Sequence, residues 1–391
     1  MKILYSAIDQ AVPAPHGGSV HVTSVADGLA ALGHDVHVFV SPGENGILPT
    51  SRATWSALPP PFGDRRLRLF RTRALSARAR AIKPDVVIER YYNFGGEGMM
   101  AASATGALAV LEVNAPIVDH PGSSKALIDR LLILQPMRRW REWQCDHAHL
   151  FVAPSAKMIP AQVPQDRIFK TEWGADTDQF QPRVGGSMVA APFPRADSDT
   201  VAVFSGAFRA WHGAIHLVEA IRRLRARGRS DIKAVLIGEG PELARTREAA
   251  ADLEGITFTG VLPHEELPAF LAAADIGVAP FDISRHSSLS YDFHWSPLKI
   301  FEYMASGLPV VAPRIQRLAE IVEDGREGAL YDAADIDGLA RTLERLADPA
   351  LRTTLGRAAR VRAVEQYSWR AHCRRLDDAL RSARERMVCG S

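Results

Sequence analysis

The 391-residue chain carries 47 basic and 45 acidic residues, a net charge of +2, and 47% of its residues are hydrophobic. This length exceeds what one ordinary core accommodates, so two domains are expected. The nearly balanced charge gives no reason to expect nucleic acid as a partner. The three cysteines show neither a pairing framework nor metal-ligand spacing, which fits a reducing compartment.

The N-terminal residues MKILYSAI run directly into a strand-like stretch and lack the layout of an export signal. No window reaches the roughly 18 uninterrupted apolar residues of a membrane span. We therefore expect a cytoplasmic protein, at most peripheral at the inner face of the membrane. Basic residues concentrate in 65–83 and again at Arg138, Arg139 and Arg141, beside two tryptophans. Both clusters are read either as solvated helix faces or as contacts with anionic lipid or an anionic acceptor.

Short β-branched runs alternate with helical patterns along the first half, which predicts a parallel sheet built from βαβ units. The expected strands are 2–7, 35–40, 85–89, 107–113 and 150–153. Between the first two, Val22, Val25, Leu29 and Leu32 share one helical face, and Gly33 supplies a C-terminal stop.

Residues 184–198 are rich in Gly, Pro, Ala and Ser and show neither the helical nor the strand periodicity of apolar residues. We therefore place an interdomain linker at 186–198. The alternation then restarts with the strand-like runs VAVFSG, KAVLIG, ITFTG, IGVAPF and LPVVA, and the chain closes with helical patterns. We predict an α/β protein with domains at 1–185 and 199–367 and a C-terminal helix, 368–391, that packs back on the first domain. Two doubly wound sheets of this kind bind ligands at the carboxyl ends of their strands.

The strongest local signal is the segment FHWSPLKIFEYMASGLPVVA. Ser296 suits an N-cap, Pro297 the first helical position, and Gly307 the position just past the end, so a short helix is expected between them. Its free N–H groups and positive dipole end attract phosphate, and Lys299 in the first turn adds a charge. Glu302 lies one turn later and can accept two hydroxyl hydrogen bonds, as a ribose diol would provide. The alternative is an ordinary capped amphipathic helix with a surface lysine and glutamate.

This segment resembles the donor-site motif of the retaining glycosyltransferase family 4, which has the GT-B fold. The segments GGSVHV, TEWGADTDQFQP, FSGAFRAWHG, LIGEGPE, FTGVLPHEEL, IVEDGREGALY and VEQYSW also resemble family elements, in the family's order. The resemblance covers nearly the whole chain and is weakest over 53–106. It implies two Rossmann-like domains facing a central cleft, and a hexosyl- or N-acetylhexosaminyltransferase that uses a nucleotide sugar.

The resemblance also implies donor-binding residues in the second domain. Glu302 would hold the ribose, and a basic pair after the first strand would hold the diphosphate. Arg209 fills the first of these positions, but His212 stands where the family often has lysine, and it adds charge only when protonated. Further expected donor contacts are the residues beside the base and at the helix start: Gly238, Val261, Leu262, Ser296 and Leu298. Gly238 and Gly240 are alternatively mere turn formers.

A second departure from the family pattern affects sugar recognition. Family members often carry paired glutamates eight positions apart, but the residue eight positions before Glu302 is His294. His294 and Asp292 are both candidates for the donor-sugar contact, or else loop residues bonded to their own backbone.

In the first domain, Gly17 and Gly18 can let backbone amides approach the diphosphate. Asn114 stands where many family members have a histidine near the reaction centre; it can bond a sugar hydroxyl but cannot act as a base. Together with Arg209 and Lys299 it forms the expected reaction centre. His21 and His120 are candidate acceptor contacts, with a solvent-facing position as the alternative for His21, and nearby Glu112 is read as structural.

The resemblance implies retention of anomeric configuration by front-face attack, with neither a metal ion nor another cofactor. A UDP sugar is the favoured donor, and the acceptor is a carbohydrate, a lipid-linked molecule or a small molecule. Two other functions fit the pattern less well: a GT-B nucleotide-sugar epimerase and a non-enzymatic two-lobed sugar-binding protein. A product assay with donor alone separates the first of these, because an epimerase needs no acceptor.

Overall fold

The computed structural model describes residues 1–14, 16–43, 46–59, 62, 70–93, 95–119, 124–131, 135–183, 191–291 and 293–389. The chain forms two compact units. The first comprises Met1–Trp173, His294–Ser296 and Trp369–Ser391, and the second comprises Gly174–Phe293 and Pro297–Ser368. The chain therefore first leaves the first unit after Trp173, ahead of the linker that the sequence places at 186–198.

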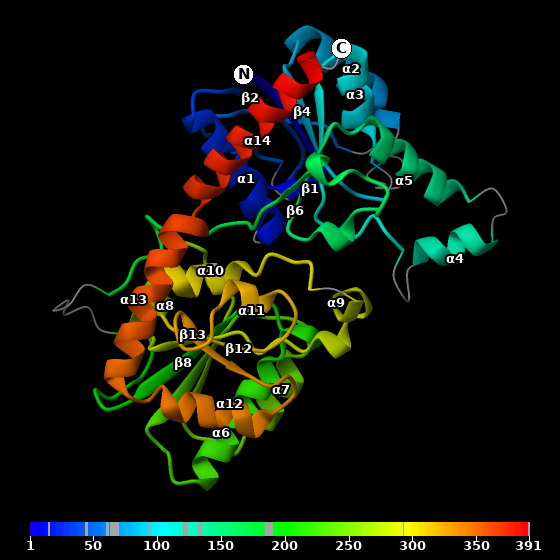
Figure 1. The fold of residues 1–391 in the computed structure, drawn as a ribbon. Helices are drawn as coiled ribbons and strands as arrows, with labels where there is room; N and C mark the ends of the chain where they lie inside the picture. Colours follow the sequence, from blue (N-terminus) through cyan, green and yellow to red (C-terminus); the bar gives the residue numbers. More distant parts are fainter. Residues whose placement is uncertain are drawn as a thin grey trace. The chain divides into compact units, whose positions relative to one another are not determined.

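The first unit is built on a parallel sheet, which in the described part of the chain has seven strands in the order β3-β2-β1-β4-β5-β6-β7 (Figure 1). The strands are β1 (Lys2–Val12), β2 (Asp35–Pro42), β3 (Thr54–Ala57), β4 (Val86–Arg90), β5 (Leu108–Glu112), β6 (Leu150–Ala153) and β7 (Ile168–Lys170). All five expected strands of this half are present. The short strands β3 and β7 were missed, because three or four residues show too little alternation to predict a strand.

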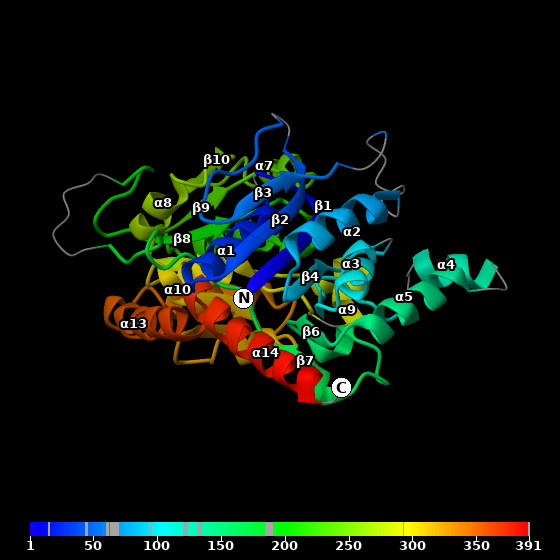
Figure 2. The ribbon, with the colours of Figure 1, turned by 90° about the horizontal axis from the view of Figure 1, so that it is seen from above.

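Helices accompany this sheet. They are α1 (Gly17–Ala31), α2 (Thr72–Ile82), α3 (Glu97–Thr105), α4 (Ser124–Leu131), α5 (Pro136–His147) and α14 (Trp369–Cys389), with short 3-10 turns η3 (Ala156–Met158) and η4 (Gln165–Arg167). Of these helices, α2, α3 and α5 contribute to the apolar core of the sheet. The expected stop of α1 is confirmed, since Gly33 follows it with φ of 87°. The C-terminal helix α14 packs along α1 within this unit, as predicted (Figure 2).

The second unit also contains a parallel sheet, with six strands among the described residues in the order β10-β9-β8-β11-β12-β13. The strands are β8 (Thr200–Ser205), β9 (Ile232–Ile237), β10 (Ile256–Gly260), β11 (Ile276–Val278), β12 (Val310–Pro313) and β13 (Gly328–Tyr331). The strand order reverses at β8, because β9 lies on one side of it and β11 on the other. Ligands bind at such switch points in open α/β sheets.

The helices of the second unit are α6 (Ala214–Ala226), α7 (Leu243–Ala249), α8 (Leu267–Ala273), α9 (Ser287–Tyr291), α10 (Leu298–Ala305), α11 (Leu318–Ile321), α12 (Ile336–Arg345) and α13 (Pro349–Gln366), with 3-10 turns η5 (Ala210–His212) and η6 (Ile283–Arg285). α6 and α12 pack together and join Phe204 and Leu236 of the sheet in one core (Figure 1). The predicted α/β class with two doubly wound sheets is confirmed. No helix in the described ranges has the length and apolar character that a membrane crossing requires.

Candidate functional site

The start of α10 differs from the sequence prediction. The helix begins at Leu298, and its N-cap, Pro297, makes no side-chain capping bond. The Ser296 hydroxyl instead donates to Glu172 Oε2 at 2.7 Å and accepts from the Trp173 N–H at 3.1 Å. The prediction that Ser296 caps the helix was therefore wrong, because this hydroxyl bonds within the first unit. The first N–H groups of α10 thus receive no side-chain cap.

The first turn of α10 carries a buried ammonium group. Lys299 Nζ lies 4.3 Å from the ring centroid of Phe204 and 5.3 Å from that of Phe281. It has no hydrogen-bond partner among the described residues. Burial lowers the pKa of Lys299 to about 7, and the nearby Glu302 offsets only part of that effect. A buried cation that contacts aromatic rings and makes no hydrogen bond among the described residues is poorly satisfied, which is the condition for binding an anion.

Glu302 follows one turn later on the same helix. Burial raises the pKa of its carboxyl to about 7, while Lys299 opposes the rise. The two groups therefore change charge in the same pH range, with opposite signs. A ligand that offers an anion to one and hydroxyl donors to the other would stabilise both charged forms.

Glycines form the loops beside this lysine. A Cβ atom at Gly206 would lie 2.8 Å from Lys299 Nζ, and one at Gly238 would lie 2.2 Å from the Gly206 carbonyl oxygen. Both glycines also have positive φ, 139° and 120° respectively. Any other residue would push the loops after β8 and β9 apart or displace Lys299. Gly240 is restricted in the same way, because its Cβ would lie 2.7 Å from the Phe208 nitrogen. These contacts account for all three glycines as packing and turn residues, and the predicted contact of Gly238 with the base stays a prediction.

The basic pair lies in the turn that follows β8. Arg209 is exposed, with its guanidinium 5.7 Å from the Trp211 ring centroid. His212 Nδ1 bonds the Ala207 carbonyl oxygen, so Nδ1 carries the hydrogen in the neutral ring. Burial, together with the positive charges of Lys299 and Arg209, lowers the pKa of His212 to about 3. The neutral ring is thus left with an acceptor at Nε2, so His212 can donate to a phosphate only after taking up a proton.

The other predicted donor contacts of this unit follow the neighbouring strand. Val261 is 55% exposed and Leu262 is half-buried, directly after β10. The Gly238 N–H donates to the Gly260 carbonyl oxygen at 2.8 Å, which ties the ends of β9 and β10 together. Residues far apart in the sequence therefore gather at the carboxyl ends of β8, β9 and β10.

The sequence matches two families of known proteins over complementary stretches. Residues 199–348 match the family described as glycosyl transferases group 1, and residues 15–159 match glycosyltransferase family 4. The chain belongs to the family 4 glycosyltransferases. The predicted recognition is thereby confirmed for both halves of the chain.

Curated relatives and solved structures agree with this assignment. The chain is 32% identical over 217 residues to a GDP-mannose-dependent α-(1-6)-phosphatidylinositol monomannoside mannosyltransferase of Mycolicibacterium smegmatis. That match spans only about half of each protein, 54% of this chain and 56% of the relative. A second relative, the MMP α-(1→4)-mannosyltransferase of Mycolicibacterium hassiacum, is 28% identical over 91% of this chain and 92% of its own length.

Among solved structures, a glycosyltransferase from Rickettsia africae superposes with a TM-score of 0.71 at 16% identity, covering 98% of both chains. Sucrose-phosphate synthase from Thermosynechococcus elongatus gives a TM-score of 0.70 at 18% identity over the whole of both chains. At these identities the likeness shows the fold, which is the GT-B architecture of two Rossmann-like domains.

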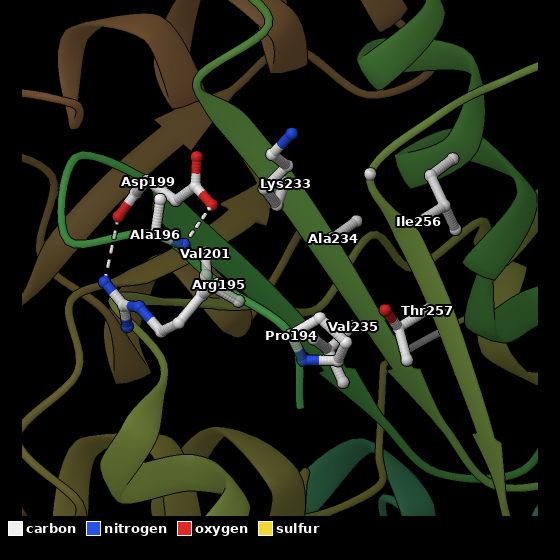
Figure 3. A pocket seen from close by; sticks show the side chains of 11 residues that line it. Pro194, Arg195, Ala196, Asp199, Val201, Lys233, Ala234, Val235, Ile256 and Thr257 are labelled. Atoms are coloured by element: carbon white, nitrogen blue, oxygen red, sulfur yellow. Dashed lines mark hydrogen bonds between the residues drawn. The ribbon is translucent and has the colours of Figure 1, made fainter. Parts of the chain in front are cut away.

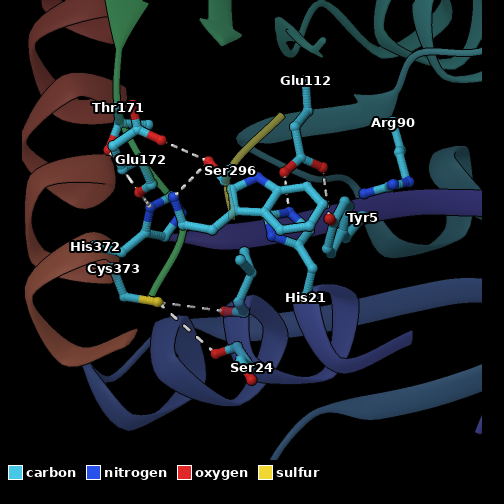
Figure 4. Close-up of polar contacts among 12 residues, drawn as sticks. Tyr5, His21, Ser24, Arg90, Glu112, Thr171, Glu172, Ser296, His372 and Cys373 are labelled. Carbon is cyan, nitrogen blue, oxygen red and sulfur yellow. Dashed lines mark hydrogen bonds and ion pairs between the residues drawn. The ribbon is translucent and has the colours of Figure 1, made fainter. Parts of the chain in front are cut away.

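In the first unit of this glycosyltransferase, a polar cluster surrounds His21 (Figure 4). His21 is fully buried, bonds Glu112 through Nε2, and stacks on Trp173 with ring centroids 4.1 Å apart. Tyr5 donates to the other oxygen of Glu112 at 2.6 Å. His21, Arg90 and Tyr5 together hold the pKa of Glu112 at about 2, against the effect of burial. The solvent-facing position was wrong for His21, because its ring lies inside this cluster, and its contact with an acceptor stays a prediction.

The remaining residues that were predicted to line the site in the first unit differ in burial and in hydrogen bonding. Gly17 and Gly18 begin α1, where the His16 side chain accepts from the Ser19 N–H. Asn114 follows β5, and its buried Nδ2 lacks a partner in the described part of the chain. His294 is only 2% exposed. His120 and Asp292 lie outside the described residues. The roles assigned to these residues stay predictions.

Tyr303, which holds α10 on the sheet, was not predicted from the sequence. Its hydroxyl accepts the Ser205 N–H at 2.7 Å, at the end of β8. Its ring covers Gly277 of β11, where a Cβ would lie 2.5 Å from two ring atoms. These contacts fix α10 beside the loop that packs on Lys299. A tyrosine next to the candidate ribose ligand Glu302 was the available signal, but the position of the tyrosine could not be predicted without the strand order.

A separate pocket of about 470 Å³ lies at the opposite ends of the same strands (Figure 3). Val201, Lys233 and Ile256 in its wall stand near the starts of β8, β9 and β10. Arg195 and Asp199 in its wall are already engaged, since Arg195 donates to the Asp199 carbonyl oxygen and pairs with Asp275. Because ligands of parallel sheets bind at the carboxyl ends, this pocket is not the candidate donor site.

Proposed function

We propose that this chain transfers mannose from GDP-mannose to a hydroxyl group of an acceptor, with retention of configuration and without a metal ion. The observation that carries the nucleotide-sugar part is the buried ammonium of Lys299 at the switch point of the second sheet, which makes no hydrogen bond within the described ranges. Mannose and GDP are proposed because the named relatives are mannosyltransferases, of which the M. smegmatis protein is named for GDP-mannose. The sequence alone favoured a UDP sugar, whereas the names of these relatives favour GDP-mannose.

In the proposed mechanism the second unit binds the nucleotide. Lys299 Nζ and the Arg209 guanidinium contact the diphosphate, assisted by the uncapped N–H groups at the start of α10. The Glu302 carboxylate accepts from the ribose hydroxyls. The diphosphate in turn stabilises the charged form of Lys299, whose pKa of about 7 otherwise leaves it partly neutral near neutral pH.

The transfer step needs no protein nucleophile. The bond between the anomeric carbon and the phosphate oxygen breaks, and the acceptor oxygen forms its bond to that carbon on the same face. The acceptor proton passes to the departing phosphate oxygen. Lys299 and Arg209 stabilise the charge that develops on the leaving diphosphate, which is where fixed charges accelerate such a reaction most.

The acceptor is proposed to be a lipid-linked or free carbohydrate, reached by a protein that contacts membranes peripherally. The support is the M. smegmatis relative, whose named acceptor is a phosphatidylinositol monomannoside.

A ligand panel followed by product analysis tests the proposal. GDP-mannose should raise the melting temperature of the full chain more than UDP-glucose, UDP-N-acetylglucosamine or ADP-glucose do, because a ligand that binds only the folded state stabilises it. Mannosyl transfer should then proceed in the presence of EDTA and give an α-linked product by NMR. Selective stabilisation by a UDP sugar would remove GDP-mannose as the donor. Conversion of GDP-mannose to an epimer without acceptor would identify an epimerase instead.

A further inference from the structure

The short helix α4 exposes large apolar side chains and buries an acidic one. Its Asp129 is buried at 7% exposure, whereas Leu127 and Leu131 are exposed at 55% and 73%. Ile128 is also exposed, at 38%. Large apolar side chains gathered on one exposed helix face mark a surface that is covered in the functional state.

The buried position of Asp129 is fixed by polar contacts between α4 and α5. Asp129 Oδ1 accepts the Met137 N–H at 2.9 Å, at the start of α5. Its other oxygen lies 3.7 Å from Arg141 Nη2, and Arg141 also pairs with Asp119 at 3.0 Å. Because Asp129 is held on the α5 side, the leucines of α4 are directed away from α5. Both views show α4 at the rim of the first unit, beyond α5 (Figures 1 and 2).

The exposed charged residues described on α4 and in the first turn of α5 are basic. Arg130 on α4 and Arg138 and Arg139 on α5 are exposed. Only Arg138 of these three has an acidic partner in the described structure, Glu142 at 2.9 Å, and that pair is itself exposed. Apolar side chains flanked by arginines are the combination that binds the interface of an anionic bilayer, where the leucines enter the acyl boundary and the arginines meet the headgroups.

We propose that the α4–α5 face, defined by Leu127, Ile128, Leu131, Arg130, Arg138 and Arg139, docks on the surface of a membrane that contains anionic lipid. This proposal deepens the proposed function, since it supplies a way for the enzyme to reach a lipid-linked acceptor. It does not depend on catalysis, because docking requires neither donor nor turnover.

Sedimentation with sucrose-loaded vesicles tests the docking. The full chain should bind vesicles of phosphatidylcholine mixed with phosphatidylglycerol, bind phosphatidylcholine alone weakly, and lose binding as salt concentration rises. The double substitution Leu127→Ser with Leu131→Ser should reduce the partition coefficient at least about tenfold, since burial of two leucines is lost. Arg138→Gln with Arg139→Gln should reduce it about fivefold per arginine on anionic vesicles.

The matched control is the double substitution Val361→Ser with Val364→Ser, at two exposed apolar residues of α13 in the second unit. This variant should bind the vesicles as well as the unsubstituted protein, the parent, does. Absence of vesicle binding, or equal binding by the leucine variant and the parent, would overturn the proposal. A parent that is dimeric in solution and becomes monomeric in the leucine variant, without vesicle binding, would assign this face to a second copy. GDP-mannose binding measured on the same samples reports separately on the proposed function.

Discussion

The two units each hold a buried polar cluster, and the clusters differ in how well their charges are satisfied. In the first unit, Glu112 is bonded by His21 and Tyr5, and its pKa is lowered to about 2. In the second unit, Lys299 has aromatic neighbours and no hydrogen-bond partner in the described structure, and its pKa is lowered to about 7. A buried charge that its neighbours stabilise supports the fold, whereas one that they leave unsatisfied is suited to a charged ligand.

The largest effect is expected from breaking the satisfied cluster. Glu112→Ala should lower the free energy of unfolding by roughly 3–5 kcal/mol, because removing one partner of a buried pair leaves the others unpaired. Urea unfolding measures the change. The folded pKa of Glu112, about 2, lies below the ordinary value of 4.5, so its contribution is fully present above about pH 4.5 and is lost as the pH falls through 2. Glu385→Ala, at an exposed position of α14, is the control and should change stability little. A loss no larger than the control's would show that the cluster does not stabilise the fold.

Lys299→Met sharpens the comparison, because here loss of binding should come without loss of stability. GDP-mannose affinity should fall roughly 10 to 150-fold, since a hydrogen bond to a charged group contributes about 1.5–3 kcal/mol. Guanosine, which has no phosphate, should bind the variant almost as well as the parent. Titration calorimetry with both ligands measures the difference, and Lys233→Met is the matched control at the far ends of the strands. Equal losses for the two ligands would argue against a phosphate contact.

The pKa of Lys299 also predicts the direction in which Lys299→Met changes the stability of the fold. The folded pKa of Lys299, about 7, is lower than the ordinary 10.5, so the unfolded chain holds this proton more tightly. As the pH falls from about 10 to 7, the unfolded chain binds this proton before the folded protein does, so the free energy of unfolding decreases. Methionine binds no proton and removes this loss of stability. Lys299→Met should be at least as stable as the parent at neutral pH.

Glu302→Gln tests the second charge of this site. The substitution should weaken GDP-mannose several-fold and guanosine by the same factor, because both ligands carry the ribose. In the parent, affinity should decrease as the pH falls below about 7, where the carboxyl becomes protonated. The variant should lack that decrease, and Glu248→Gln on α7 should retain it. A variant with the parent's affinity and pH profile would remove Glu302 from the ribose site.

The smallest effect is expected at Tyr303, which supports the site without touching the ligand. Tyr303→Phe removes the bond from the Ser205 N–H and should cost about 1 kcal/mol of stability. If the tyrosine positions α10, the pH at which the affinity for GDP-mannose declines should also shift, because the surroundings of Lys299 change. Tyr331→Phe, at another buried tyrosine of the unit, should leave that pH profile unchanged.

The sequence predicted much of this arrangement and missed identifiable parts of it. The parallel sheets, α1, α14 and the position of Lys299 on a short helix follow from periodicity and from Gly307, which has the expected positive φ of 73°. The partner of Ser296 could not be predicted, because Glu172 lies 124 residues earlier. The burial of His21 could not be predicted either, since its partner Glu112 comes from another strand of the sheet. Contacts between residues distant in sequence depend on strand order, which local patterns do not encode.

The most direct test of the unsatisfied lysine is the proton uptake that accompanies GDP-mannose binding. Calorimetry at about pH 8 in buffers of different ionisation enthalpy measures it, at a pH where Lys299 is mostly neutral and Glu302 is already ionised. We predict uptake of nearly one proton by the parent and none by Lys299→Met. Binding without proton uptake, or the same uptake in both proteins, would contradict the assignment of Lys299 to the diphosphate.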